Sequence, residues 1–432
     1  MKRVLIITYY WAPSGGSGVQ RWVKMVKYLP QFNWQPVVYT PQNPEFPSID
    51  HSLEQDLPED IEVIKTHIWE PYNIYRNLFG KKGETISAGF ISENKKSGWK
   101  ERLSIRIRGN FLIPDPRRFW VRPSVKFLSK YLKTNKIDAI ITTGPPHSMH
   151  LIGLGLKKRF PNLTWIADFR DPWTNIDFYK DLKLSKLADI IHHIKEKNVA
   201  ENADSIVVVS NDMINDFAAM QTKGIALITN GFDSDDFPKS PATADSKFSL
   251  VHTGLLSAAR NPLTLWQVLG QLCAENSDFR QDLEIKLIGK TDFSVLEKIR
   301  ENALQHNLTT VDYLTHAEAI AAQQTAQVLL LLINNSANVA GILTGKLYEY
   351  LAARRPILAI GASKSNVADI LQQTRAGKIA DFDDFETTKK NVLEFYNQFK
   401  TNALDLPKNS IEQYSRRNLA GKYAELLNVV SG

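Results

Sequence analysis

The chain has 432 residues, 43% hydrophobic and 23% charged, so its composition is that of an ordinary folded protein and its length favours two domains. The single cysteine, Cys273, excludes an internal disulfide and a cysteine-based zinc site. A net charge of +7 favours anionic partners without selecting among them.

The first segment predicts a strand, a glycine-rich loop and a helix. Residues 4–9 form a short apolar run interrupted by polar groups, which indicates a buried strand rather than a signal peptide. Gly16 and Gly18 lie in the loop that follows, and an amphipathic helix covers 19–29. Such a loop can bind an anion or simply form a tight turn. An NAD-binding fingerprint is disfavoured because Arg21 replaces its third glycine.

Strand-like runs recur through the first half, and helical patterns separate most of them. These runs cover 36–39, 61–65, 139–143, 165–168 and 206–210. The alternation predicts a doubly wound α/β domain over residues 1–225, with an insertion at about 68–123.

Two polar motifs follow predicted strands, where parallel α/β sheets bind their ligands. His147 follows the strand at 139–143 and is either a capping or packing residue or a substrate contact. Asp168, Arg170 and Asp171 follow the next strand. They either pair with one another or bind the hydroxyl groups of an acceptor substrate.

Positive charge is concentrated in residues 95–133, where basic side chains alternate with Trp99, Phe111, Phe119 and Trp120. This pattern is typical of a segment lying on an anionic membrane surface, and a solvated helix face is the alternative. RNA binding is less favoured, because no nucleic-acid-binding module accompanies the charge. No apolar run approaches the roughly 18 residues of a membrane span. We therefore expect a cytoplasmic protein with peripheral contact to the inner face of the membrane.

The second half repeats the alternation of strands and helices. Its strands are expected at 248–253, 283–289, 311–315, 328–333, 357–360 and 377–381. They predict a second doubly wound domain over 226–410, followed by a C-terminal helix over 411–432. Gly254 follows the first strand, and Arg260 precedes the next helix. His316 stands at a helix start, where it either lines a ligand pocket or caps the helix.

The strongest evidence for a binding site lies in residues 335–361. This segment predicts a loop, a helix that begins near Thr344, and a strand. Amide groups at a helix start favour an anion. Lys346 and Glu349 lie on the same helical face. This combination suits a nucleoside diphosphate, with amides and a lysine for the phosphates and a carboxylate for the ribose. A weak surface ion pair is the alternative.

These motifs resemble the GT-B glycosyltransferases, specifically glycosyltransferase family 4 and its bacterial polysaccharide and lipopolysaccharide subgroup. The resemblance rests on Gly-Val-Gln-Arg-Trp at 18–22, Asp-Phe-Arg-Asp-Pro-Trp at 168–173, Thr-Asn-Gly-Phe-Asp at 229–233 and Lys-Leu-Tyr-Glu-Tyr at 346–350. It implies two Rossmann-like domains facing a cleft. It further implies transfer of a sugar from a UDP- or GDP-sugar to a glycan or lipid-linked acceptor, with retention of configuration and without a metal or other cofactor.

The resemblance also implies roles for the candidate residues. His147 would orient the transferred sugar, while Arg260 and Lys346 would neutralise the leaving diphosphate. The donor-binding residues would be Gly16, Gly18, Gly254, His316, Ile342, Leu343, Thr344 and Glu349, and the acceptor-side residues Asp168, Arg170 and Asp171.

The chain departs from the family at two positions. Leu255 stands where a cation is usual, and Gly341 where the first of two glutamates is usual. Backbone amides around Ile342 and Leu343 would take the place of that acid. Two other functions therefore stay open: a sugar-nucleotide 2-epimerase of the same fold, and a non-catalytic nucleotide-binding partner in polysaccharide assembly.

Overall fold

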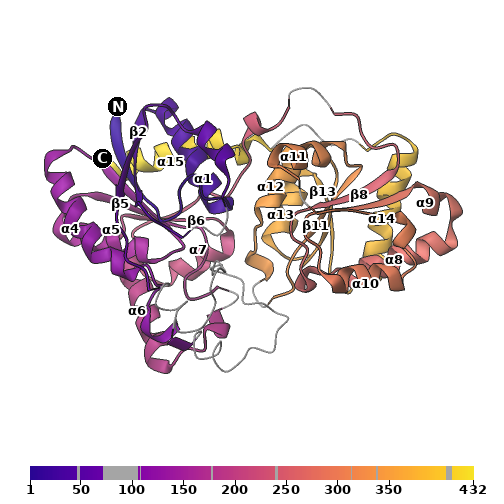
Figure 1. The fold of residues 1–432 in the computed structure, drawn as a ribbon, viewed down its shortest axis with the longest axis horizontal. Coiled ribbons are helices and arrows are strands. Elements are labelled where there is room, and N and C mark those ends of the chain that lie inside the picture. Colours follow the sequence, from indigo (N-terminus) through magenta and orange to yellow (C-terminus); the bar gives the residue numbers. More distant parts are fainter. Residues whose placement is uncertain are drawn as a thin grey trace. The chain divides into compact units, whose positions relative to one another are not determined.

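The computed structural model describes residues 1–45, 49–71, 106–107, 109–176, 179–238, 242–312, 314–336, 339–404 and 411–432. The chain divides into two compact units (Figure 1). Unit 1 comprises Met1–Thr229 and Arg416–Gly432, and unit 2 comprises Asn230–Ser415. The division thus falls after Thr229, whereas the sequence placed it near 225, and the chain returns to unit 1 at Arg416 rather than at 411.

Unit 1 is built on a seven-stranded parallel sheet of order β3-β2-β1-β4-β5-β6-β7. Its strands are β1 Lys2–Ile7, β2 Trp34–Pro41, β3 Glu62–Thr66, β4 Ala139–Gly144, β5 Thr164–Phe169, β6 Ser205–Val208 and β7 Ile225–Leu227. Its helices are α1 Ser17–Tyr28, α4 Arg118–Thr134, α5 Ser148–Arg159, α6 Lys186–Asn202, α7 Asn211–Ala218 and α15 Arg416–Ser431.

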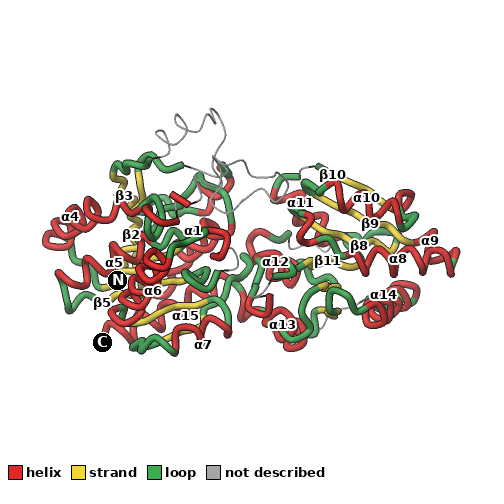
Figure 2. Tube along the Cα trace, turned by 90° about the horizontal axis from the view of Figure 1, so that it is seen from below, coloured by secondary structure: helices red, strands yellow, loops and turns green. Residues whose placement is uncertain are grey.

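Helices cover both faces of this sheet (Figure 2), which explains why its central strands are apolar at consecutive positions. In β1, Leu5 and Ile7 point into one core, whereas Val4 and Ile6 point into the core on the other face. The second core also contains Leu419 and other residues of the C-terminal helix α15, so the end of the chain completes the first unit.

Unit 2 contains a six-stranded parallel sheet of order β10-β9-β8-β11-β12-β13. The strands are β8 Phe248–Thr253, β9 Leu283–Ile288, β10 Leu308–Val311, β11 Val328–Leu332, β12 Ile357–Ile360 and β13 Gly377–Ala380. The helices are α8 Leu263–Glu275, α9 Ser277–Asp282, α10 Phe293–Glu301, α11 His316–Thr325, α12 Gly345–Ala352, α13 Asn366–Thr374 and α14 Phe385–Lys400. The predicted fold class, two doubly wound α/β units, is confirmed.

Two edge strands escaped the sequence analysis. The strand expected at 311–315 is wrong, because β10 ends at Val311 and is only partly buried, with Thr309 and Thr310 exposed. The short β7 is also only partly buried and was not predicted. An edge strand lacks the continuous apolar run of a central strand, which is the signal that located the others.

The basic segment differs from the expected amphipathic surface. Trp99 lies outside the described residues, and Trp120 is part of the core, where its ring stacks on Tyr39 at 4.8 Å. Arg117 is buried as well, and its Nε lies 3.2 Å from Glu70 Oε1. Phe111 and Phe119 are exposed. No helix in the described part of the chain is long and apolar enough to span a membrane.

Candidate nucleotide and acceptor sites

The sheet of unit 2 has a topological switch point between β8 and β11. From β8 the chain proceeds to β9 and β10 on one side of the sheet, whereas β11 lies on its other side. The loops after β8 and β11 therefore diverge at the carboxyl edge, which is where such sheets bind ligands. Gly254 directly follows β8, and the loop that ends at Thr344 connects β11 to α12.

The side chain of Lys346 crosses directly over Gly254. A Cβ atom on Gly254 would lie 2.8 Å from Lys346 Cε and 2.9 Å from its Nζ, and Gly254 has a φ of +95°. Both the close approach and the left-handed backbone require glycine at this position. Burial, with a further contribution from Arg260, lowers the pKa of Lys346 to about 8.

Arg260 brings a second cation to the same place. It ends a short 3-10 helix after β8, and its Nε donates a hydrogen bond of 2.6 Å to Asn334 Oδ1 from the loop after β11. The pair thereby joins the two loops of the switch point. Because Arg260 is close enough to lower the pKa of Lys346, the two side chains create a local positive potential that favours a diphosphate.

Glu349 is held by a scaffold of neutral polar groups. Gln323 Nε2 donates to Glu349 Oε2 at 3.4 Å and to Thr253 Oγ1 at 3.1 Å, while the Thr253 amide donates to the Tyr350 hydroxyl at 3.0 Å. Burial raises the pKa of Glu349 above its usual value. Burial thus shifts Lys346 and Glu349 toward their neutral forms, which does not occur in a solvated surface pair.

Thr344 and the first turn of α12 provide hydrogen-bond donors at this site. The Thr344 side chain does not cap the helix, and within the described residues its buried Oγ1 has no hydrogen-bond partner. The first amides of a helix have no intrahelical acceptor. The Ile342 amide donates to Val339 O at 3.3 Å, and the Ile342 and Leu343 side chains pack against the core.

His316 is not needed to cap α11. Thr315 and Glu318 form a capping box there, in which the Glu318 amide donates to Thr315 Oγ1 at 3.3 Å. His316 Nε2 instead lies 3.8 Å from Asp236 Oδ2. The imidazole of His316 therefore lies near the carboxylate of Asp236, in the loop at the start of unit 2.

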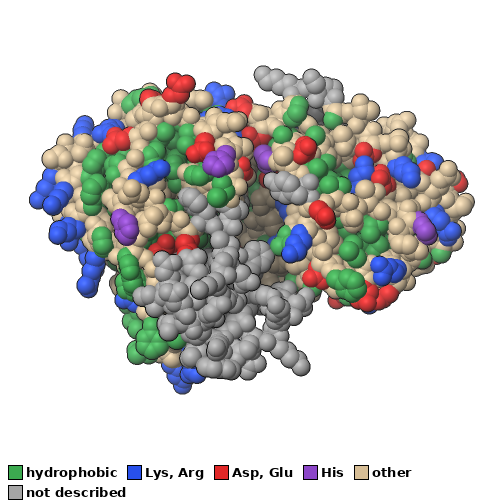
Figure 3. All heavy atoms as spheres, viewed as in Figure 1, with side chains coloured by type: hydrophobic (Ala, Val, Ile, Leu, Met, Phe, Trp, Pro, Cys, Tyr) green, Lys and Arg blue, Asp and Glu red, His purple; other side chains and the backbone are tan. Residues whose placement is uncertain are grey.

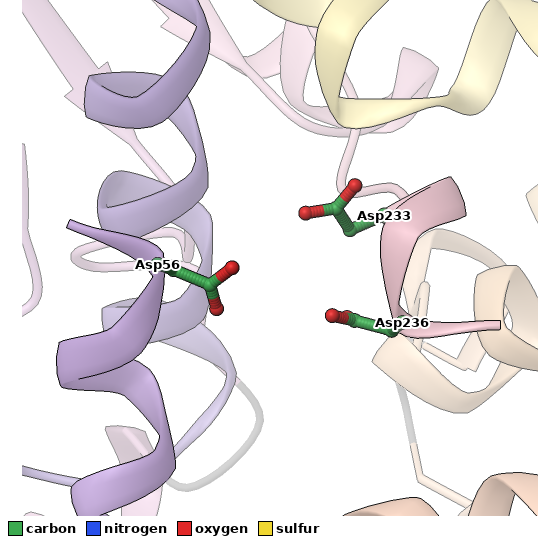
Figure 4. A group of neighbouring side chains, drawn as sticks. All are labelled: Asp56, Asp233 and Asp236. Atoms are coloured by element: carbon green, nitrogen blue, oxygen red, sulfur yellow. The ribbon is translucent and has the colours of Figure 1, made fainter. Parts of the chain in front are cut away.

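Figure 4 shows this carboxylate, Asp236, beside Asp233, which caps the turn by accepting from the Asp235 amide at 3.2 Å. The third side chain drawn, Asp56, belongs to unit 1. Asp233 and Asp236 belong to unit 2.

Unit 1 has its own switch point, between β1 and β4. The loop with Gly16 follows β1, and a Cβ atom on Gly18 would lie only 1.5 Å from Arg170 Nη1. The Arg170 guanidinium therefore rests against the first turn of α1, where its Nε donates to Thr143 Oγ1 at 3.1 Å. Burial lowers the pKa of Arg170 from its usual high value. Gly18 and Arg170 belong to two motifs that the sequence analysis did not connect with each other.

His147 lies at the same edge, at the start of α5. Its ring stacks on Trp173 at a centroid distance of 4.9 Å and is hydrogen-bonded to the backbone of Pro172. Nδ1 has no hydrogen-bond partner among the described residues and would lie 3.1 Å from a Cβ atom on Gly144. Burial, followed by the charges of His150 and Arg170, holds the pKa of His147 well below its usual value. The neutral ring can therefore accept a hydrogen bond from a hydroxyl.

Asp168, predicted to be an acceptor-side residue, lies in the interior of unit 1. Its carboxylate is completely buried and accepts four hydrogen bonds of 2.7–3.0 Å. The donors are Arg21 Nη2, Trp22 Nε1, Thr143 Oγ1 and Tyr423 Oη. No capacity is left for a substrate hydroxyl. Asp171, by contrast, is exposed, and its role stays a prediction.

The sequence analysis missed Asn334 and Gln323, which orient Arg260 and Glu349. Each comes from an element far along the chain from the residue it orients. Asparagine and glutamine are common on protein surfaces, so neither carried a signal in the sequence.

No family model matches the chain, and no curated protein matches it. Several solved structures do. A sucrose-phosphate synthase from Thermosynechococcus elongatus is 14% identical and has a TM-score of 0.63, covering 100% of this chain and 99% of that one. TarM of S. aureus is 12% identical, with a TM-score of 0.62 and 99% of both chains covered.

A protein from Listeria monocytogenes described as a UDP-N-acetylglucosamine 2-epimerase is 9% identical, with a TM-score of 0.55, covering 98% of this chain and 95% of that one. At such identities the similarity establishes architecture. The chain has the GT-B fold. Because transferases and an epimerase share that fold, function has to be argued from the site itself.

Proposed function

We propose that this protein is a glycosyltransferase that moves a sugar from a nucleoside diphosphate sugar to a hydroxyl of a glycan or lipid-linked acceptor. One observation carries the proposal. The Lys346 ammonium lies across Gly254, next to Arg260, at the switch point of the unit 2 sheet. A lysine kept partly desolvated beside a second cation is suited to an anion with more than one charge.

The chemistry follows from where charge develops. When the bond between the sugar and the diphosphate breaks, negative charge accumulates on the departing phosphate. Lys346, Arg260 and the first amides of α12 stabilise that charge without a metal ion. Glu349, held by Gln323, accepts hydrogen bonds from the ribose. On the unit 1 side, His147 orients the transferred sugar.

The finer assignment rests on the sequence motifs. The Lys-Leu-Tyr-Glu-Tyr segment at 346–350 supports family 4, a UDP- or GDP-sugar donor and transfer with retention of configuration. A TarM structure is described as a complex with UDP, which supports a uridine donor here. Polysaccharide or lipopolysaccharide synthesis is the corresponding process.

The two alternatives are less well supported. A 2-epimerase needs acid and base groups that exchange a proton with the sugar, whereas Glu349 is engaged by Gln323 and His147 is kept neutral. A non-catalytic partner is consistent with Leu255 and Gly341 in place of charged residues. It does not account for His147 Nδ1, which has no hydrogen-bond partner within the described ranges.

Thermal unfolding with UDP and with GDP, in EDTA, tests the donor site. At a ligand concentration about 100 times Kd, we expect stabilisation by roughly 2.7 kcal/mol. Lys346→Ala should abolish it, and Lys364→Ala, a change at an exposed lysine of the same unit, should not. No stabilisation by either nucleotide would refute the proposal, and stabilisation only with added Mg²⁺ would refute its metal independence.

Product analysis separates the remaining functions. A transferase releases the nucleoside diphosphate only when an acceptor is present, so UDP or GDP should accumulate with a glycan or lipid acceptor and not without one. An epimerase would convert the sugar nucleotide with no acceptor, and a non-catalytic partner would do neither.

A further inference from the structure

Helix α6 carries an exposed apolar stripe. Leu187, Ile190 and Ile194 are 69%, 53% and 53% exposed. Their spacing of three and four residues places them on one face of the helix. Single exposed apolar side chains are common on protein surfaces, but an aligned set marks an interaction surface. Figure 3 shows hydrophobic side chains next to Lys and Arg over α6, at the lower left.

The stripe continues onto a neighbouring segment. Asn110 fixes residues 106–107 and 109–111 to the start of α6, since its Oδ1 accepts from the Ser185 amide at 2.7 Å. This places Ile107 and the 71% exposed Phe111 at the N-terminal end of the helix.

The contact extends to α4 through Arg118, whose Nη1 donates to Phe111 O at 2.8 Å. The next residue, Phe119, is exposed too. We call the six apolar side chains the α6 patch: Ile107, Phe111, Phe119, Leu187, Ile190 and Ile194.

Cations border the α6 patch. Arg106, Arg118, Lys183 and Lys186 are exposed, and Lys195 lies close enough to Arg118 to feel its charge. Apolar side chains bordered by lysine and arginine match the interface of an anionic bilayer. There the apolar groups enter the acyl boundary while the cations meet the headgroup phosphates.

The opposite side of α6 faces Trp173, which lies beside His147. His192 on α6 is buried and accepts a hydrogen bond of 3.0 Å from Trp173 Nε1. Trp173 in turn stacks on His147. The α6 patch is therefore separated from His147 by the thickness of one helix and one aromatic ring. A surface that contacts lipid here would bring membrane-embedded acceptors close to His147.

We propose that the α6 patch docks unit 1 on an anionic membrane and so presents it to a lipid-linked acceptor. The acceptor part rests on the proposed function, whereas the docking itself does not. The surface overlaps only in part with the one expected within 95–133. Ile107, Phe111 and Phe119 belong to that segment, whereas its Trp120 is buried in the core and the α6 stripe lies outside it.

Co-sedimentation of the full chain with vesicles tests the docking. The wild-type protein should bind vesicles of phosphatidylglycerol and phosphatidylethanolamine and not vesicles of phosphatidylcholine alone. The triple variant Leu187→Ser, Ile190→Ser, Ile194→Ser should bind at least about tenfold more weakly. Val429→Ser removes an apolar side chain of α15 that is 80% exposed, and this variant should bind like the wild type.

Three results would overturn the proposal. They are a wild type that does not bind the anionic vesicles, a triple variant that binds them equally well, and an α6 patch that proves to join two copies of the chain. In the last case the triple variant would change the oligomeric mass in size-exclusion chromatography without changing vesicle binding. The UDP thermal shift of the triple variant shows that it is folded. If no nucleotide stabilises the wild type but vesicle binding depends on the patch, docking stands and the proposed reaction falls.

Discussion

The affinity for a nucleoside diphosphate should fall as the pH rises through 8, because the ligand needs Lys346 in its charged form. Burial and Arg260 lower the pKa of this lysine to about 8 in the free protein. A bound diphosphate favours the ammonium and so raises that pKa. Binding therefore takes up a proton, and it weakens wherever the free lysine is already deprotonated.

The magnitude follows from the fraction of charged lysine. With a pKa of about 8, roughly nine-tenths of the Lys346 side chains are charged at pH 7 and roughly one-tenth at pH 9. The dissociation constant should therefore rise about tenfold between these pH values, or about 1.4 kcal/mol. The nucleotide does not contribute much to this change, because a terminal phosphate with a pKa near 6 is already ionised at pH 7.

Isothermal titration calorimetry with UDP measures both the affinity and the proton uptake, if buffers with different ionisation enthalpies are compared. Lys346→Arg is the control, because a guanidinium stays charged throughout this range and should leave the affinity almost independent of pH. An equal pH dependence in the wild type and in this variant would refute the reasoning, since another group would then be titrating.

Three further predictions use single substitutions. Gly254→Ala should abolish the UDP thermal shift because its Cβ would displace the lysine side chain, whereas Gly224→Ala, where a Cβ meets nothing closer than 3.7 Å, should keep it. Asp168→Asn should lower the free energy of unfolding, measured in urea, by about 3–5 kcal/mol, because it removes the negative charge that pairs with the buried guanidinium of Arg21. Asp171 is exposed, so Asp171→Asn should change the free energy of unfolding by less than about 0.5 kcal/mol. His147→Ala should lower acceptor-dependent turnover by about tenfold to a hundredfold while leaving UDP affinity unchanged; equal loss of both would contradict its role in orienting the transferred sugar.

The fold was predictable because most strands are buried on both faces. Central strands such as β8 and β12 appear in the sequence as continuous apolar runs, and both were located to the residue. The shared face of Lys346 and Glu349 was predictable because both lie within one helix, where spacing alone determines which residues share a face. Edge strands such as β10 lack this signal.

The role of Asp168 was not predictable, because it depends on contacts with distant parts of the chain. In β5, alternation places Asp168 on the same face as Ile166, toward the core that α1 and α15 complete. Only the folded chain shows that Arg21 and Tyr423 meet it there. The same Asp-Phe-Arg-Asp segment thus contains one buried structural carboxylate and one exposed carboxylate.

The differences between this chain and the family that its sequence resembles bear on the same lysine. With Leu255 in place of a cation and Gly341 in place of an acid, Arg260 and Lys346 supply the positive side chains of the donor site. Arg260 stays charged at any ordinary pH, so the lysine is the group whose charge varies. A site with another permanent cation would lose a smaller share of its attraction when the lysine is deprotonated. A weak pH dependence would therefore mean that groups other than Lys346 neutralise most of the diphosphate charge.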